Sequence, residues 1–456
     1  KEVGPFLLSL FLAIQTGSSV PKSWSHTRII VFPKKGKDPL LASSYRPISL
    51  INADSKLYSK ILATRLSMVI AKVVSPWQHG FIPGRDTTDH IRRLITLLDI
   101  TNIDGSPFSV IFLDAEKAFD RVAWEFLWAV LKFYAVGEVF ISAVRSLYLR
   151  PMATLGIMGS ESPLFDIQRG TRQGCPCSPL LFALYINPFI ELLLLSPNIP
   201  PVLSRGYRTQ VLAYADDIAV VSSNPSVAIP TVEALAFDFG LVYGYKLNTS
   251  KTQVLRNRFC TGHSSWDVQD PVYLGVTLVT QVDRIVSVNF DSLLHKADAI
   301  LKKVNNVHLT IIGRGNYIKI MILPTFLYLF RSIPLYFPKS CFIRLDAICS
   351  KFMWSYGTPR RAFRKLALSP EQGGLGVSEF QLYYWASFLT HAKSLFSVPQ
   401  LPPALGSIYP VAIPHTSQLA LGPLAHGALV RTFCNNCFKG VRYKTVLAMN
   451  YVWRNV

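Results

Sequence analysis

Apolar runs and their spacing divide this chain into a series of expected strands and helices. The β-branched stretch Thr27–Phe32 precedes Pro33 and a basic turn, so it predicts a strand that ends in a loop. The continuous apolar run Phe108–Leu113 is typical of a buried central strand. Apolar positions at helical spacing predict an amphipathic helix over Ser55–Val74 and a long helix from Ala115 to about Val136.

The pattern continues beyond these elements. Thr209–Ser223 predicts two strands joined by a turn at Tyr214–Asp217, which places two acids at the tip of an apolar hairpin. Pro230–Tyr243 predicts a helix with its proline at the first helical position. Pro271–Val276 predicts a short strand, and a helical patch is expected near Phe380–Leu395.

The charge of the chain favours a polyanionic partner. Half of the 456 residues are hydrophobic, which permits large buried cores, while 47 Lys and Arg against 27 Asp and Glu give a net charge of +20. A basic exterior suits nucleic acid or an acidic membrane surface. From Arg284 to Lys365, 14 Lys and Arg stand against three acids in segments with apolar faces, so we expect a separate helical unit with a basic side.

Membrane spans and zinc sites are not expected. Each of the three most apolar stretches is too short or is interrupted by polar or charged residues: Phe6–Ile14, Pro179–Ser196 and Tyr317–Phe337. The odd number of cysteines, seven, indicates reduced thiols in an intracellular protein. Cys434 and Cys437 have the spacing of half a zinc site, but Cys260 and His263 could complete it only by a distant return of the chain.

Three carboxylates carry the candidate chemistry. Asp114 ends one predicted strand, and Asp216 and Asp217 lie in the turn of the predicted hairpin. Carboxylates brought together at strand ends repel one another unless cations lie between them. Oxygen ligands of this kind suit Mg²⁺ or Mn²⁺, and two such ions commonly serve in-line phosphoryl transfer.

Seven runs resemble, in the family's order, motifs of reverse transcriptases from LINE-type retrotransposons, which lack long terminal repeats: Tyr45–Leu50, Gly80–Arg85, Phe112–Asp120, Arg172–Phe182, Ala213–Asp217, Leu247–Thr252 and Tyr273–Val276. Ile312–Arg314 and Gly373–Val377 resemble LINE sequences beyond the polymerase core. The likeness covers about Thr27 to Leu389. It implies an RNA-directed DNA polymerase with an RNA template, a DNA primer and deoxynucleoside triphosphates as partners.

The resemblance also implies roles for single residues. Asp114, the backbone of Ala115, Asp216 and Asp217 would hold Mg²⁺, or Mn²⁺ in its place. Phe119 would lie under the sugar and exclude a 2′-hydroxyl.

The nucleotide pocket would draw on further positions. Gln173 and Gly174 would shape it, with Gly174 letting the backbone approach the base pair, and Tyr214 would contact the substrate. Arg46, with a lysine from Lys34, Lys35 or Lys37, would hold the triphosphate. Lys251 would help to protonate departing pyrophosphate, and the turn at Tyr273–Gly275 would grip the primer end.

The implied fold is α+β, a right-hand polymerase with a mostly antiparallel palm sheet. The expected parts are an N-terminal extension and fingers (residues 1–107), the palm (108–282), a basic helical thumb (283–366) and a C-terminal region (367–456). In this family an upstream endonuclease nicks the DNA, and it is absent from these residues. The family's proteins act as ribonucleoprotein in nucleus and cytoplasm.

Two alternatives remain open from sequence alone. A copy of such an element can keep the fold and bind nucleic acid without turnover, because one substitution in the site abolishes activity. An RNA-directed RNA polymerase shares the palm and the Asp-Asp turn, but it needs a residue that admits the 2′-hydroxyl at the position of Phe119. Neither a Walker A loop, a dinucleotide fingerprint nor a His-Glu-x-x-His motif is present.

Overall fold

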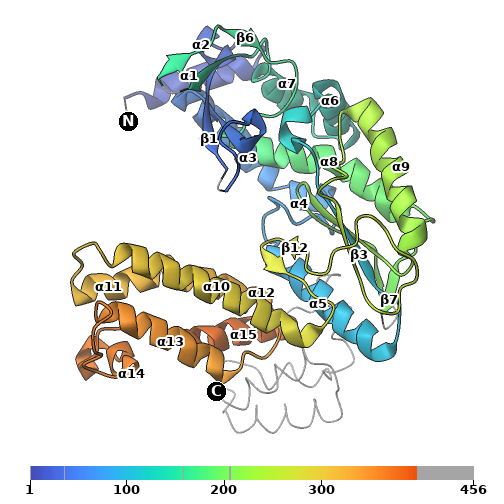
Figure 1. Cartoon of the computed structure of the whole chain (residues 1–456). Helices are drawn as coiled ribbons and strands as arrows, with labels where there is room; N and C mark the ends of the chain where they lie inside the picture. Colours follow the sequence, from blue (N-terminus) through green and yellow to red (C-terminus); the bar gives the residue numbers. More distant parts are fainter. Residues whose placement is uncertain (1, 35, 158, 205–206, 398–456) are drawn as a thin grey trace.

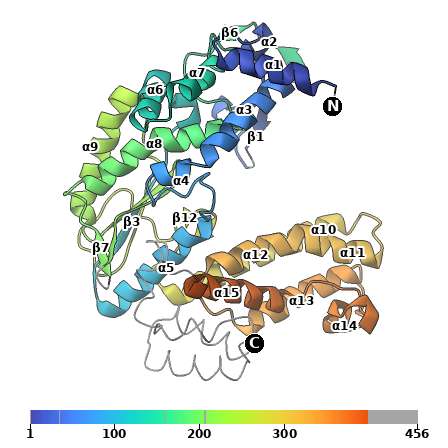
Figure 2. The same cartoon turned by 180° about the vertical axis from the view of Figure 1, so that it is seen from behind.

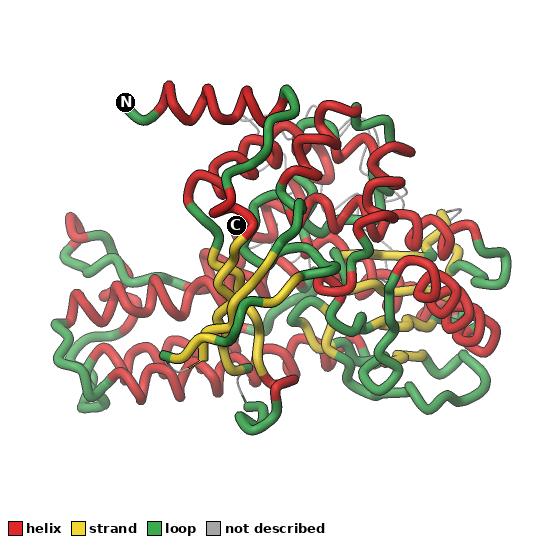
Figure 3. The backbone as a smooth tube through the Cα atoms, turned by 90° about the horizontal axis from the view of Figure 1, so that it is seen from above, coloured by secondary structure: helices red, strands yellow, loops and turns green. Residues whose placement is uncertain are grey.

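The structure is a computed structural model that describes residues 2–34, 36–157, 159–204 and 207–397. Its elements follow an arc, with strand β1 (His26–Pro33) near one end and helix α10 (Val282–Val304) at the other (Figures 1 and 2). Strands lie between helices in the middle of the molecule, and long helices extend to one side (Figure 3).

A five-stranded sheet lies at one end of the arc. β1 pairs antiparallel with β2 (Tyr45–Leu50) and parallel with β4 (Met152–Ile157), and β4 also pairs with the two-residue strands β5 (Ser160–Glu161) and β6 (Phe165–Asp166). The strand expected over Thr27–Phe32 is therefore confirmed. The other elements in this part of the chain are α1 (Gly4–Gln15), α2 (Lys22–Ser25), η1 (Ala42–Ser44), α3 (Ala53–Ser67), α4 (Ile70–Val73) and α7 (Glu138–Ser146).

The central sheet has four antiparallel strands, in the order β11 (Gln253–Arg256), β3 (Ser109–Leu113), β10 (Asp217–Ser222) and β9 (Val211–Tyr214). All residues of β3 are buried, as its continuous apolar run predicts. The mostly antiparallel sheet expected from sequence is thus present, and its hairpin is β9–β10.

Helices cover both faces of this sheet. Alternate residues of a strand point to opposite faces, so Val110 and Phe112 join the core that includes helix α5 (Thr87–Asp104). Ile111 and Leu113 join the core that includes α8 (Ser178–Leu195), against which α9 (Pro225–Tyr243) also packs. Shorter elements complete this part: η2 (Ala118–Arg121), α6 (Trp124–Phe133), β7 (Val202–Ser204), β8 (Tyr207–Thr209), β12 (Val272–Tyr273) and β13 (Val276–Thr277).

The basic segment forms a helical unit, as predicted. Its elements are α10, α11 (Ile311–Tyr317), the π-helical turn η3 (Ile318–Ile322), α12 (Leu323–Ser332), α13 (Lys339–Met353), α14 (Phe363–Ala367), η4 (Pro370–Gln372) and α15 (Phe380–Ser397). α10 and α12 contact α5, and α15 packs on α12. The helical patch expected near Phe380–Leu395 is therefore α15, and it belongs to this unit.

The prediction of one long helix from Ala115 to Val136 is wrong. Lys117 has a left-handed backbone (φ 51°), the 3₁₀ turn η2 follows, and α6 begins only at Trp124. The backbone of this stretch is occupied elsewhere, because the amide of Glu116 donates to the carbonyl of Lys246 at 2.8 Å and the carbonyl of Phe119 accepts from the amide of Thr171 at 2.8 Å. These long-range bonds replace helical ones.

Three smaller boundaries also differ. The helix expected over Ser55–Val74 is divided into α3 and α4. The helix expected at Pro230 already begins at Pro225, which takes the first-turn position, while Pro230 lies inside it. The strand expected over Pro271–Val276 is the hairpin β12–β13, because Leu274 and Gly275 both have positive φ and turn the chain.

In the described part of the chain, two helices are long and apolar enough to cross a membrane by length and composition. They are α8, whose apolar stretch is 67% buried inside the molecule, and α9, whose apolar stretch is 22% buried. The cysteines that could begin a zinc site, Cys434 and Cys437, lie outside the described residues.

Candidate active site

Three carboxylates meet at one end of the central sheet. Asp114 directly follows β3 and Asp217 opens β10. The antiparallel register pairs Ile218 with Leu113, so the next position along the ladder brings Asp217 beside Asp114. Between the hairpin strands, Ala215 has a left-handed backbone (φ 55°), which turns the chain so that Asp216 and Asp217 follow at its tip.

The charges of neighbouring carboxylates affect the pKa of Asp216 and Asp217. Desolvation first, then the charges of Asp216 and Asp114, raise the pKa of Asp217 to about 6. Desolvation and the charge of Asp114 also raise the pKa of Asp216. The Asp217 side chain is exposed by surface area, yet the protein atoms around its carboxyl displace enough water for desolvation to lead. The site disfavours negative charge unless a cation is present.

The segment after Lys246 runs beside Asp114 and delivers Lys251 to it. The amide of Asn248 donates to the carbonyl of Asp114 at 2.8 Å, and Ala115 forms an antiparallel bridge with Leu247. Lys251 Nζ lies 3.5 Å from Asp114 Oδ2. The structure therefore places Asp114, Ala115, Asp216, Asp217 and Lys251 at the same end of the sheet, and their roles stay predictions.

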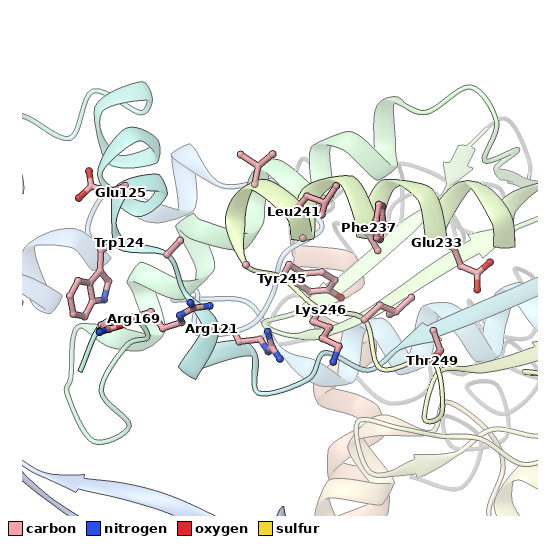
Figure 4. A pocket seen from close by; sticks show the side chains of 17 residues that line it. Arg121, Trp124, Glu125, Arg169, Glu233, Phe237, Leu241, Tyr245, Lys246 and Thr249 are labelled. Atoms are coloured by element: carbon pink, nitrogen blue, oxygen red, sulfur yellow. The ribbon is translucent and has the colours of Figure 1, made fainter. Parts of the chain in front are cut away.

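A cavity of about 980 Å³ lies behind this segment, under α9. Figure 4 shows Phe237 and Leu241 on α9 above it, with Arg121 and Lys246 below. The two cations flank Glu116, whose carboxylate lies 2.8 Å from Lys246 Nζ and 3.6 Å from Arg121. They lower the pKa of Glu116, the hydrogen bond from Lys246 contributing most, and so fix the chain just after Asp114.

Phe119 lies near the turn that carries Asp216 and Asp217. Its ring stacks on Phe182, with centroids 4.2 Å apart, and meets the edge of Phe81 at 6.1 Å. Phe81 also lies 6.2 Å from the ring of Tyr214. Because packing from two sides holds the half-buried Phe119 ring, it presents a fixed surface rather than a mobile one.

Gln173 and Gly174 connect the region around Phe119 to the first sheet. The carbonyl of Gln173 accepts from the amide of Ser49 at 2.8 Å, and its side chain lies 3.4 Å from Asp120 Oδ1. Gly174 has φ 119°, and a Cβ there would lie 2.7 Å from the carbonyl oxygen of Ser49. The close approach that this glycine permits in the structure is to strand β2, and the approach to a base pair that the resemblance implies stays a prediction.

A cavity of about 250 Å³ lies at this junction, lined by Pro47 and Ser49 of β2 and by Asp120 and Gln173 among others. Arg46 alternates with these residues along β2, so its exposed side chain points from the opposite face of the strand. The structure does not bring Arg46 into the cavity beside Gln173. Of the neighbouring lysines, Lys35 lies outside the described residues.

The sequence reading missed Gln78. Its side chain is fully buried and hydrogen-bonds to the backbone of Ala215, inside the carboxylate turn. The sequence does contain a signal for it, because Gln78 is a polar residue two positions before the Gly80–Arg85 motif and the motif's expected roles do not account for it. Tyr273, in the turn expected to grip the primer end, also lies near the acids, with its hydroxyl 3.5 Å from the carbonyl oxygen of Asp217.

An antiparallel sheet with three acids at one end, a second sheet beside it and a basic helical unit opposite define a right-hand polymerase. Residues 32–278 match the family described as reverse transcriptase (RNA-dependent DNA polymerase), and this match covers more than half of the chain. The chain belongs to this reverse transcriptase family, and the recognition from sequence motifs is confirmed.

Its relatives come from retrotransposons without long terminal repeats. It is 33% identical over 205 residues to the transposon TX1 uncharacterized 149 kDa protein of Xenopus laevis, which covers 45% of this chain and 16% of that protein. It is 29% identical over 234 residues to the Pol polyprotein of the type-1 element R2 of Popillia japonica, covering 51% and 32%. It is 26% identical over 230 residues to the RNA-directed DNA polymerase from mobile element jockey of Drosophila melanogaster, covering 50% and 24%.

The chain thus spans a third or less of the length of these relatives. Among solved structures, it is similar to telomerase from Candida tropicalis in complex with a fragment of telomeric RNA, at 13% identity and a TM-score of 0.44, covering 90% of this chain and 68% of that one.

Proposed function

We propose that this chain catalyses RNA-directed DNA synthesis, adding deoxynucleotides to a primer 3′-hydroxyl with two Mg²⁺ ions, or Mn²⁺ in their place, at Asp114, Asp216 and Asp217. The observation that carries the proposal is the placement of these three carboxylates at one sheet end, where the charges of Asp216 and Asp114 help to raise the pKa of Asp217. Nucleic-acid substrates and a divalent metal follow from the family.

The donor set suits such ions. Carboxylate and carbonyl oxygens are preferred ligands of Mg²⁺, and the Ala115 carbonyl adds one beside Asp114. In the described residues, no three His, Cys, Asp or Glu side chains already converge closely enough to hold an ion by themselves. Mg²⁺ commonly binds proteins through one or two carboxylates and takes its other oxygen ligands from substrate phosphates and water. When bound, two ions lower the pKa of the attacking hydroxyl and stabilise charge on the reacting phosphate.

Other residues orient and select the substrate. Phe119, held by Phe182, blocks the space of a 2′-hydroxyl and so favours deoxynucleotides over ribonucleotides. Tyr214 and Gln173 bound the nucleotide site. Lys251, already beside Asp114, is placed to give a proton to departing pyrophosphate.

Two outlying groups complete the scheme. Arg46 lies on the exposed face of β2, opposite the face that lines the Gln173 cavity, so it would reach a triphosphate only from outside that cavity. The basic helices α10–α14 contact the backbone of the template–primer duplex without reading its sequence.

We propose the division that the sequence predicts, with fingers to residue 107, palm to 282 and thumb from 283, except that the thumb continues beyond 366 and includes α15, which packs on α12. The fingers sheet also takes in β4–β6 from the palm range. An endonuclease that nicks the target would act from another part of a longer protein.

The test is primer extension on an oligo(dT)-primed poly(rA) template with Mg²⁺. We expect extension by the parent and none by Asp216→Ala/Asp217→Ala. Asp238→Ala, which removes an exposed carboxylate on α9, is the matched control and should extend as the parent does. If the parent binds the duplex but does not extend it, the chain is a binding remnant and the catalytic proposal fails.

A further inference from the structure

A short strap, Trp77–Gly80, extends the edge of the central sheet beside β9. Gln78 forms a parallel bridge with Ala213; the amide of His79 donates to the carbonyl of Ala213 at 2.8 Å, and the amide of Ala213 donates to the carbonyl of Trp77 at 3.0 Å. The strap therefore lies against the strand that leads directly into the carboxylate turn.

The side chain of Gln78 reaches into that turn. Its Oε1 accepts from the amide of Ala215 at 2.9 Å and from the amide of Gly80 at 2.8 Å, and its Nε2 lies 3.5 Å from the carbonyl oxygen of Ala215. Ala215 is buried and left-handed, so its peptide groups turn out of the β9–β10 ladder. The buried amide of Gln78 supplies the partners that the ladder does not.

Gly80 sets the distance between strap and turn. A Cβ at this position would lie 2.1 Å from the amide nitrogen of Ala215, so only glycine permits the approach. The strap is itself anchored, because the guanidinium of Arg85 donates to the carbonyls of Ala71, Ser75 and Gln78. The turn is thus held by a fixed element from outside its own hairpin.

We propose that Gln78 is a positioning residue for the metal-binding carboxylates: by fixing the Ala215 peptide, it sets the backbone from which Asp216 and Asp217 project. This inference rests on the proposed two-metal function. Ala215 directly precedes both acids, so a rotation of its peptide redirects their carboxylates without removing them. Partners that orient metal ligands typically contribute 10- to 100-fold to metal affinity.

A merely structural role would look different, and the chain offers a matched control. Gln210 is also buried, precedes β9 at the strand's other end, and donates from Nε2 to the carbonyls of Leu193 and Ser196 at 2.9 and 3.3 Å. Its Oε1 accepts from the guanidinium of Arg208. Gln78→Met and Gln210→Met therefore each remove a buried side-chain amide, one from either end of the same strand. Both should lower the melting temperature, but only Gln78→Met should affect metal binding.

The first measurement is Mn²⁺ binding to the whole chain on a template–primer duplex, detected by electron paramagnetic resonance. The second is the dependence of primer extension on Mg²⁺ concentration. We expect Gln78→Met to raise the half-saturating concentration of either ion at least about tenfold, with duplex affinity unchanged. Gln210→Met should stay within about twofold of the parent.

Gln78→Glu preserves side-chain volume and the acceptor for both backbone amides, and because burial favours the neutral carboxyl, its O–H replaces Nε2 toward the Ala215 carbonyl. The variant should therefore fold and stay within about threefold of the parent. Parental metal binding by Gln78→Met overturns the inference, and so does a loss by Gln78→Glu as large as that expected of Gln78→Met. Should Gln78→Met not fold, Gln78→Glu still decides by the same threefold limit. A parent that binds no Mn²⁺ at all refutes the proposed function instead.

Discussion

Lowering the pH from 7 to 5 should weaken divalent-metal binding to this protein about tenfold. The perturbed group is Asp217, whose pKa is raised to about 6 by desolvation and then by the charges of Asp216 and Asp114. A metal binds the ionised carboxylate, which is about one-eleventh of the population at pH 5 and ten-elevenths at pH 7 for this pKa. At the ordinary value of 3.8 the group would be more than about 90% ionised at both pH values, and affinity would hardly change.

The assay is calorimetric titration with Mn²⁺ at pH 5, 6 and 7, repeated in buffers of different ionisation enthalpy to count released protons. We expect nearly one proton released per site at pH 5 and little at pH 7. Asp216 adds to the effect in the same direction, since its pKa is also raised. Equal affinity at pH 5 and pH 7 would refute the reasoning, because it would mean that Asp217 ionises at its ordinary pKa.

The same shift has a consequence for stability without metal. Because the folded-state pKa of Asp217 lies above its unfolded value, its contribution is fully present below pH 3.8 and is lost as pH rises through about 6. Other groups titrate in this range, so the difference between the parent and Asp217→Asn isolates it. The variant should gain melting temperature over the parent at pH 7 and not at pH 4, and the parent should recover part of the gap when Mg²⁺ is added.

Four substitutions extend the test. Phe119→Ala should raise ribonucleotide use relative to deoxynucleotide use roughly 10- to 100-fold, measured as a ratio of kcat/KM values; unchanged selectivity in an active variant contradicts the gate. Gly174→Ala should lower the free energy of unfolding by about 2–4 kcal/mol, since its Cβ would lie 2.7 Å from the Ser49 carbonyl oxygen, whereas denaturant melts of Gly4→Ala should show little change. Arg46→Ala should raise KM for deoxynucleotides about tenfold with little effect on kcat, and the reverse pattern argues against triphosphate binding. Lys251→Met should lower kcat about 100-fold at unchanged KM, and full activity would exclude its role as an acid.

Local patterns sufficed wherever the structure is locally determined. The run Phe108–Leu113 predicts a buried strand because a strand covered on both faces must be apolar at every position, and β3 has that burial. The hairpin around Tyr214–Asp217 was also predictable, since both arms are apolar and the acids interrupt them. The family match confirms the polymerase class that these motifs indicate.

Sequence patterns failed where distant backbone decides local conformation. Helical spacing continues through Ala115–Val136, but the first part of this stretch bonds to Lys246 and Thr171, so periodicity alone cannot show that it leaves the helix. Arg46 is a similar case. Its motif indicates phosphate contact, but only the pairing of β2 shows that it projects from the face opposite Ser49.

The β9–β10 hairpin is contacted on two sides, by one short hydrogen bond and one long one. On one side, Gln78 bonds the Ala215 amide at 2.9 Å. On the other, the hydroxyl of buried Tyr273 lies 3.5 Å from the carbonyl oxygen of Asp217, at the outer limit of a hydrogen bond. The residue before the acids is therefore bonded from outside its own hairpin, and Asp217 is held by its pairing with Tyr214 at the start of β10. Both contacts reach the backbone of the carboxylate turn from outside its hairpin, so Gln78 and Tyr273 bear on where Asp216 and Asp217 lie.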